Sequence, residues 1–172
     1  AEGLEIWTCC DCTETTSRKI AMLDHDYAVT AVKPNVIIHL GDHYDDGSII
    51  AEENDSIRFL QVPGNCDRYR CYPPQPEILC CDIGGVRFYM THGHLHGVKM
   101  STGRLLRDAA EAKASVVLYG HTHQADCRQE QGIWMLNPGT CGSYGGSVGL
   151  IEAENGKVSS CRILRQEDLA DL

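Results

Sequence analysis

The chain has 172 residues, a length that fits a single core, and we expect one domain over residues 1–172. Its 24 acidic and 15 basic side chains give a formal charge of −9, which argues against nucleic acid and anionic membranes as partners. The longest apolar runs, 36–38 and 116–119, are too short to cross a membrane. With ten Cys and no visible signal peptide, the expectation is a cytoplasmic protein with reduced thiols.

Short apolar blocks bounded by Gly, Pro, Asn or Asp recur along the chain and predict β-strands. In chain order they are 4–10, 36–40, 57–62, 78–83, 86–91, 116–119, 133–136, 148–151 and 158–164. Helices are predicted at 15–32 and 101–114, where apolar residues recur at the spacing of one helical face. Segments 46–53 and 68–76 are expected to be loops that shape a pocket.

The order of these elements predicts an α/β fold. The first half alternates strand, helix and strand, which favours parallel pairing through a right-handed crossover. In the second half, Gly84-Gly85, Gly132 and Asn155-Gly156 each separate two strand blocks, as is typical of tight hairpins. Parallel pairing followed by hairpins indicates one mixed sheet, or two packed sheets, flanked by helices.

Polar residues follow five of the predicted strands. Ligands of α/β proteins gather at the carboxyl ends of strands, and Asp, Asn and His together suit a divalent metal such as Mn, Fe or Zn. Each motif alone is most often a turn, although His-x-His on a strand would place two imidazoles on one face. The whole set predicts a metal site, and its members are Asp11, Asp42, Asn65, His92, and the pair His121 and His123.

The ordered motifs resemble those of the calcineurin-like metallophosphoesterase superfamily. Within it, the chain is most similar, over about residues 4–165, to the small bacterial and archaeal phosphodiesterase branch related to Vps29. The resemblance implies a four-layer α/β sandwich with two packed mixed β-sheets flanked by helices. The motifs that carry it are Asp11, Gly41-Asp42, Gly64-Asn65-Cys66-Asp67, His92-Gly93-His94, Gly120-His121-Thr122-His123 and Asn137-Pro138-Gly139.

The resemblance also implies a two-metal site in which Asp42 is the bridging carboxylate. One ion would be held by Asp11 and His123, and the other by Asn65, His92 and His121. Mn is the expected metal, with Fe, Zn or Ni as alternatives. A metal-bridging hydroxide would attack the phosphorus of a small phosphodiester substrate, so the implied activity is that of a metal-dependent phosphodiesterase. The sequence does not decide whether the chain forms a homo-oligomer.

Two positions depart from the superfamily pattern. Thr13 stands where the first motif of the superfamily has a ligand His, and a hydroxyl binds these metals more weakly than an imidazole. Cys12 could replace this ligand, but it lies one residue away from the ligand position and would normally point to the other face. Cys66 stands where many members have a His that can protonate the leaving group. His94 is therefore the candidate catalytic acid; an equally weighted alternative is that His94 only contacts the phosphate. Because of Thr13, the alternative to an enzyme is a Vps29-like binding scaffold with an impaired metal site.

The remaining cysteines allow two further readings, both disfavoured. Cys9 and Cys12 form a C-x-x-C typical of thioredoxin-like redox sites, but Asp11 between them already belongs to the metal motif. A structural zinc site built with Cys80 and Cys81 lacks a second C-x-x-C. The last three cysteines are expected to pack as small apolar side chains; they are Cys127, Cys141 and Cys161.

Overall fold

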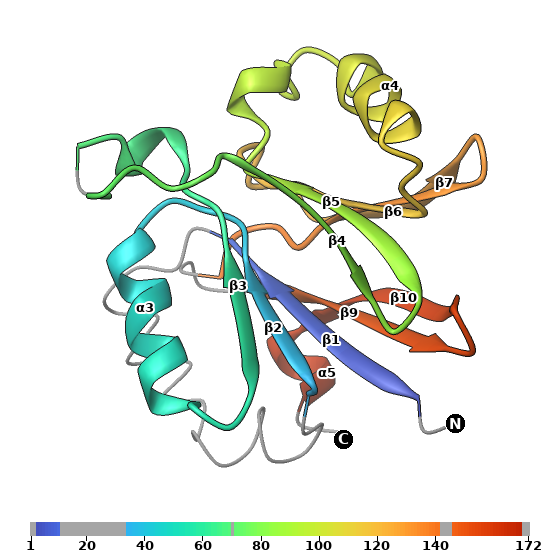
Figure 1. Ribbon diagram of the computed structural model, residues 1–172, viewed down its shortest axis with the longest axis horizontal. Helices are drawn as coiled ribbons and strands as arrows, with labels where there is room; N and C mark the ends of the chain where they lie inside the picture. The colour runs from blue at the N-terminus through green and yellow to red at the C-terminus, as the bar shows by residue number, and fades with distance from the viewer. Residues whose placement is uncertain (1–2, 11–33, 70, 142–145, 170–172) are drawn as a thin grey trace.

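The computed structural model describes residues 3–10, 34–69, 71–141 and 146–169. The predicted helix at 15–32 and the residues Asp11, Cys12 and Thr13 lie outside these ranges. Two five-stranded sheets pack face to face, with helices on their outer sides (Figure 1). The predicted four-layer α/β sandwich with two mixed sheets is therefore confirmed.

The first sheet has the strand order β10-β9-β1-β2-β3. β1, β2 and β3 are parallel, whereas β9 runs antiparallel to both β1 and β10. The predicted hairpin at Asn155-Gly156 joins β9 to β10, and both of its residues have positive φ. The strands are β1 (Leu4–Cys9), β2 (Val36–His39), β3 (Arg58–Gln61), β9 (Ser147–Glu154) and β10 (Lys157–Arg165).

The second sheet has the strand order β4-β5-β6-β8-β7. β6 is parallel to both of its neighbours, and two antiparallel hairpins close the edges at the predicted turns, Gly84-Gly85 and Gly132. The strands are β4 (Ile78–Ile83), β5 (Val86–Thr91), β6 (Val116–Leu118), β7 (Asp126–Glu130) and β8 (Ile133–Asn137). The turn residues Gly84, Gly85, Gln131 and Gly132 all have positive φ, as tight two-residue hairpin turns of this type require.

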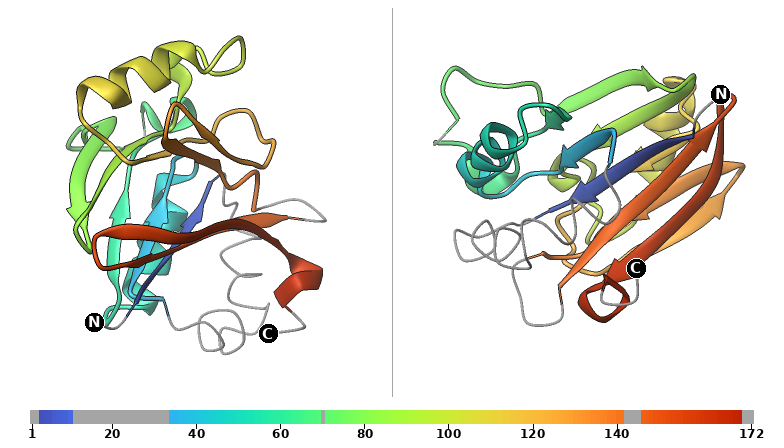
Figure 2. Two further views of the ribbon diagram at one scale, coloured as in Figure 1. Left: turned by 90° about the vertical axis from the view of Figure 1, so that its right-hand side faces the viewer. Right: turned by 90° about the horizontal axis from the view of Figure 1, so that it is seen from below.

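Three apolar clusters hold the layers together. The largest fills the space between the sheets and includes Ile6, Phe88 and Ile151, all fully buried. A second cluster joins the outer face of the second sheet to α4 (Gly103–Glu111), and Figure 2 shows this helix lying across that face. The third joins the outer face of the first sheet to Ile50 of α3 (Tyr44–Glu53).

One prediction is wrong: all of segment 46–53 is helical rather than a loop, because it belongs to α3. The predicted helix at 101–114 is confirmed in the shorter α4. Three short helical turns complete the elements: η1 (Asn65–Asp67), η2 (His94–His96) and α5 (Gln166–Leu169). None of the helices in the described ranges is long and apolar enough to span a membrane.

Candidate metal centre

The turns after β2 and β3 bring Asp42 against Gly64. Asp42 has φ 58°, a left-handed backbone conformation that non-glycine residues seldom adopt and that concentrates at functional sites. Gly41 has φ 101°, and a Cβ atom there would lie 2.6 Å from the backbone nitrogen of Gly64. The two turns can approach this closely only because both positions are glycine.

Asp67, the last residue of the Gly64-Asn65-Cys66-Asp67 motif and not itself a predicted ligand, ties these two turns together. Its carboxylate is buried and accepts hydrogen bonds from the backbone N–H of Gly64 at 2.7 Å and of Tyr44 at 2.9 Å. The backbone N–H of Cys66 donates to Oδ1 of Asp42 at 3.1 Å. One carboxylate oxygen of Asp42 is therefore held by a backbone hydrogen bond, while the other faces His92 at the end of β5.

His92 follows β5 and lies at the centre of the candidate site. Its Nδ1 lies 2.8 Å from the carbonyl oxygen of Leu40 and donates to it. A neutral imidazole carries one N–H, so Nε2 presents a lone pair. Burial lowers the pKa of His92 below its usual range, which keeps the ring neutral near pH 7. The Sγ atom of Cys10, a residue that sequence reasoning missed as part of the site, lies 3.8 Å from Nδ1.

Three polar side chains converge on Nε2 of His92. It lies 3.1 Å from Oδ1 of Asn65, 3.2 Å from Nδ1 of His121 and 3.5 Å from Oδ2 of Asp42. Neighbouring ligand atoms on an ion with bonds of about 2.1 Å lie about 3.0–3.4 Å apart. This donor set fits a divalent cation, because its facing atoms are lone-pair acceptors that only a proton or a positive ion can bring into contact.

His121 and His123 lie on the loop after β6, as their position after the predicted strand 116–119 indicated. β6 ends at Leu118, and the two histidines have φ 68° and 60°. The His121 ring centre lies 5.0 Å from that of His92. Burial lowers the pKa of His121 to about 4, helped by the neighbouring His92 and Lys99. The side chain of His123 is exposed, farther along the same loop.

Buried Asn137 holds this loop in place. Its Nδ2 donates to the carbonyl oxygen of Gly120 at 3.1 Å and to Oγ1 of Thr122 at 2.9 Å. Its Oδ1 accepts from the backbone N–H of Gly139 at 3.0 Å. The backbone N–H of Gly120 in turn donates to the carbonyl oxygen of His92 at 2.9 Å. The Asn-Pro-Gly motif thus fixes the histidine loop to the end of β5.

The two candidate catalytic residues occupy different positions. The His94 ring centre lies 5.4 Å from that of His92 and 6.1 Å from that of His121, with the side chain 18% exposed. Its Nε2 lies 4.0 Å from Oε1 of Glu77. Cys66 is exposed, and its backbone rather than its thiol orients Asp42. His94 therefore lies at the rim of the cluster.

Asp11, the remaining predicted ligand, lies outside the described residues. In the described ranges, the His, Cys, Asp and Glu side chains by themselves do not form a group of three or more that would hold a metal ion. The amide of Asn65 supplies the additional oxygen of the cluster. The structure thus brings together Asp42, Asn65, His92 and His121, with His94 beside them.

A sequence profile of the calcineurin-like phosphoesterase superfamily domain matches residues 12–156. The chain belongs to this superfamily. It is 31% identical over 107 residues to the probable metallophosphoesterase YsnB of Bacillus subtilis and 28% identical over 120 residues to phosphodiesterase MJ0936 of Methanocaldococcus jannaschii. These matches span 62% and 63% of this chain, but only 59% of YsnB and 68% of MJ0936.

Solved structures share the fold over nearly the whole chain. A predicted phosphoesterase from Streptococcus pneumoniae superposes with a TM-score of 0.72 at 23% identity, covering 97% of this chain and 92% of that one. An archaeal phosphodiesterase gives 0.70 at 20% identity, with 94% and 99% covered. Vps29 from Cryptosporidium parvum gives 0.69 at 16% identity, with 96% and 98% covered. At these identities the likeness establishes the fold alone.

Proposed function

We propose that this protein is a metal-dependent phosphodiesterase. The observation that carries the proposal is the convergence of Asn65, His121 and Asp42 on Nε2 of His92, in a member of the calcineurin-like superfamily. The names of two relatives, a probable metallophosphoesterase and a phosphodiesterase, support it. A chain with a formal charge of −9 also needs a local positive charge to bind a phosphate ester.

The chain supplies ligands for two divalent ions, for which Mn is the expected metal. Asn65, His92 and His121 would hold one ion, Asp11 and His123 would hold the other, and Asp42 would contact both. When bound, the ions supply a water of lowered pKa as nucleophile and neutralise the phosphoryl oxygens. The backbone N–H of Cys66 and the carbonyl of Leu40 orient Asp42 and His92 before any ligand arrives.

The protein's own contribution to the reaction is positioning and, through His94, proton transfer. The phosphodiester would lie over the His92 cluster, where the neutral imidazoles and the Asn65 amide add no negative charge. A protonated His94 at the rim would donate its proton to the departing oxygen as the phosphorus–oxygen bond breaks. Cys66 is a poor donor for this step near neutral pH.

The proposal is tested by measuring metal content and hydrolysis together. Protein purified with Mn should carry more than one ion per chain and hydrolyse bis(p-nitrophenyl) phosphate, and a chelator should abolish the hydrolysis. Asp42→Ala should reduce the rate at least about 100-fold. Asp55→Ala is the matched control, an exposed aspartate beyond α3, and should keep the wild-type rate. Absence of bound metal, or full activity in Asp42→Ala, would overturn the proposal.

A binding scaffold is the second candidate, favoured by Thr13 at the position of the superfamily's ligand His. A scaffold would keep the fold that this chain shares with Vps29 and would not need the first metal site. Thr13→His separates the two. For an enzyme, the substitution should raise Mn affinity at the site of Asp11 and His123 and lower the Mn concentration needed for activity. A protein that lacks hydrolysis with and without the substitution would be a scaffold.

A further inference from the structure

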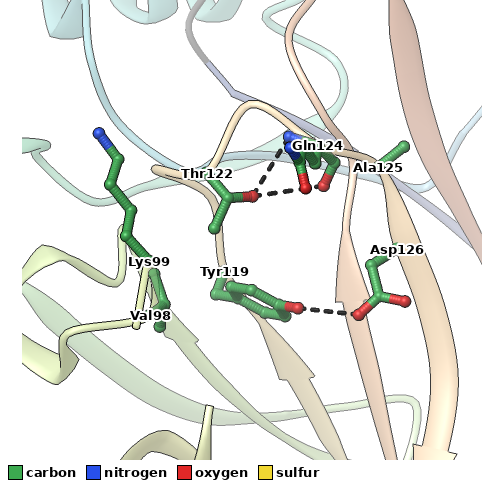
Figure 3. Close-up of a pocket in the computed structure, with 7 residues that line it drawn as sticks. All are labelled: Val98, Lys99, Tyr119, Thr122, Gln124, Ala125 and Asp126. Atoms are coloured by element: carbon green, nitrogen blue, oxygen red, sulfur yellow. Dashed lines mark hydrogen bonds between the residues drawn. The ribbon is translucent and has the colours of Figure 1, made fainter. Parts of the chain in front are cut away.

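A pocket of about 430 Å³ is lined by residues of two loops that also carry residues of the candidate metal centre (Figure 3). The loop that follows η2 forms one wall, and the loop between β6 and β7 forms the other, so both walls continue from segments that carry site histidines. Thr122, which lines the pocket, stands between His121 and His123 in the chain. The volume falls within the range of about 300–1,000 Å³ typical of small-molecule sites.

The pocket has opposite charges on its two sides, as Figure 3 shows with Lys99 on one side and Asp126 on the other. Lys99 is the only cation among the lining residues, and its charge acts on His121. Oδ2 of Asp126 accepts a hydrogen bond from the Tyr119 hydroxyl at 3.0 Å and contacts Arg128. Because Arg128 also pairs with Glu130, the Asp126 side keeps a net negative charge.

Gln124 provides the polar group that a ligand in this pocket would meet. Its backbone N–H donates to Oγ1 of Thr122 at 3.2 Å, and Asn137 donates to the same oxygen. This chain of hydrogen bonds links the position of Gln124 to buried Asn137. Gln124 is one of the residues that line the pocket (Figure 3), and its side-chain amide offers both a donor and an acceptor.

We propose that this pocket binds a nucleoside group of the phosphodiester, on the side of the phosphate that is retained after hydrolysis. This inference rests on the proposed function and names its substrate class. Lys99 would contact a phosphate oxygen, and Gln124 would pair with the amide-like edge of a base, which also presents a donor and an acceptor. The negative charge at Asp126 excludes a second phosphate from the far side.

Two esters with the same leaving group test this assignment. Thymidine 5′-(p-nitrophenyl) phosphate and methyl p-nitrophenyl phosphate both add water at phosphorus and release p-nitrophenolate; they differ only in the retained group. We expect the wild-type KM to be lower for the thymidine ester. Gln124→Ala should raise the KM of the thymidine ester relative to that of the methyl ester about 3- to 10-fold, because one hydrogen bond to the base is lost. Gln129→Ala, an exposed glutamine on β7 outside the pocket, is the control and should leave the ratio unchanged.

Product binding gives a readout that does not require catalysis. By calorimetry, Gln124→Ala should weaken binding of thymidine 5′-monophosphate more than binding of inorganic phosphate, whereas Lys99→Met should weaken both. Equal KM ratios and equal nucleotide affinities in wild type and Gln124→Ala would overturn the pocket assignment. If nucleotide binding depends on Gln124 but neither ester is hydrolysed, the phosphodiesterase proposal fails and the nucleotide pocket stands.

Discussion

The backbone of Gly64 lies directly against the carboxylate of Asp42. A Cβ atom at position 64 would overlap Oδ1 of Asp42 and lie 2.9 Å from its Cγ. Gly64 has φ −96°, a value that any residue can adopt, so the requirement for glycine here is space rather than backbone conformation. The turn after β3 thus fixes where the candidate bridging carboxylate can stand.

We predict that Gly64→Ala displaces Asp42 and weakens Mn binding at least about 10-fold, with a loss of stability of about 1–3 kcal/mol from the overlap. Calorimetric Mn titration and urea unfolding measure the two effects. Gly103→Ala is the matched control, because a Cβ there meets only Oγ of Ser101 at 3.4 Å. Equal Mn affinity in Gly64→Ala and Gly103→Ala would contradict the geometry.

Asn137 leads to the second prediction, because it makes three hydrogen bonds while fully buried. Asn137→Leu would leave the Gly120 carbonyl and the Gly139 N–H without these partners, which should lower the free energy of unfolding by about 2–4 kcal/mol. The histidine loop should also loosen, so more Mn should be needed to saturate the site. Urea unfolding and Mn titration test this, and a variant with unchanged values for both would rule out the anchoring role.

Much of the fold was predictable because its signals are local. The glycines at the three hairpins and the apolar strand blocks predict β4, β5, β9 and β10 to within a few residues. α3 was missed because its ten residues hold Gly47 and only one pair of large aliphatic side chains, which makes no helical stripe. The glycine has a tertiary cause: a Cβ there would lie 3.1 Å from Nδ1 of His39 and would overlap Gln61.

Four of the six predicted ligands lie together in the structure, but the contacts that hold them in place were not predictable. The resemblance indicates that Asp42, Asn65, His92 and His121 act together, and the structure places them in contact. The contacts that hold them cannot be read from spacing, because Cys10 meets His92 only when the two sheets pack, and Asp67 joins the turn after β3 to Tyr44 at the start of α3. A His-x-His pattern likewise cannot show that both histidines adopt left-handed backbone conformations on the loop after β6.

The third prediction concerns His39, whose ring lies fully buried in β2. Burial lowers the pKa of His39 to about 4, and neither ring nitrogen has a hydrogen-bond partner in the described part of the chain. The unfolded state therefore binds up to one more proton between about pH 6.5 and 4, so stability falls as the pH drops through this window, by at most about 1.4 kcal/mol per pH unit.

Urea unfolding at pH 7 and pH 5, with chelator present, measures this effect. His39→Leu should shrink the loss of unfolding free energy between the two pH values, because the substituted side chain binds no proton. His92 and His96, whose pKa values are also lowered by burial, should preserve part of the loss. An identical pH dependence in wild type and His39→Leu would show that His39 is not buried in its neutral form.

The fourth prediction concerns the two edge strands β7 and β10, which belong to different sheets. The Sγ atoms of Cys127 and Cys161 lie 3.1 Å apart across this junction. The hydrogen bond between the thiols lowers the pKa of Cys127, which makes it the more reactive thiol, and raises the pKa of Cys161. Diamide, which accepts two electrons and two protons, should therefore join them in a disulfide and raise stability by about 2–4 kcal/mol.

Alkylation after unfolding counts the thiols that remain, and peptide mapping identifies the bond. Cys127→Ser should abolish the crosslink and the added stability, whereas Cys141→Ser, which alters a cysteine packed on the other face of the first sheet, should retain both. A crosslink that forms equally well in Cys127→Ser would mean that other cysteines are closer than this pair.

The fifth prediction separates the two roles open to His94. If His94 protonates the leaving group, replacing it should lower the rate most when the departing oxyanion is a strong base. p-Nitrophenolate is a weak base and departs without a proton. His94→Gln should then lower kcat for bis(phenyl) phosphate about 100-fold or more, and for bis(p-nitrophenyl) phosphate by much less. Equal losses on both esters would instead assign His94 to phosphate binding, which its ring distances of 5.4 and 6.1 Å from His92 and His121 also permit.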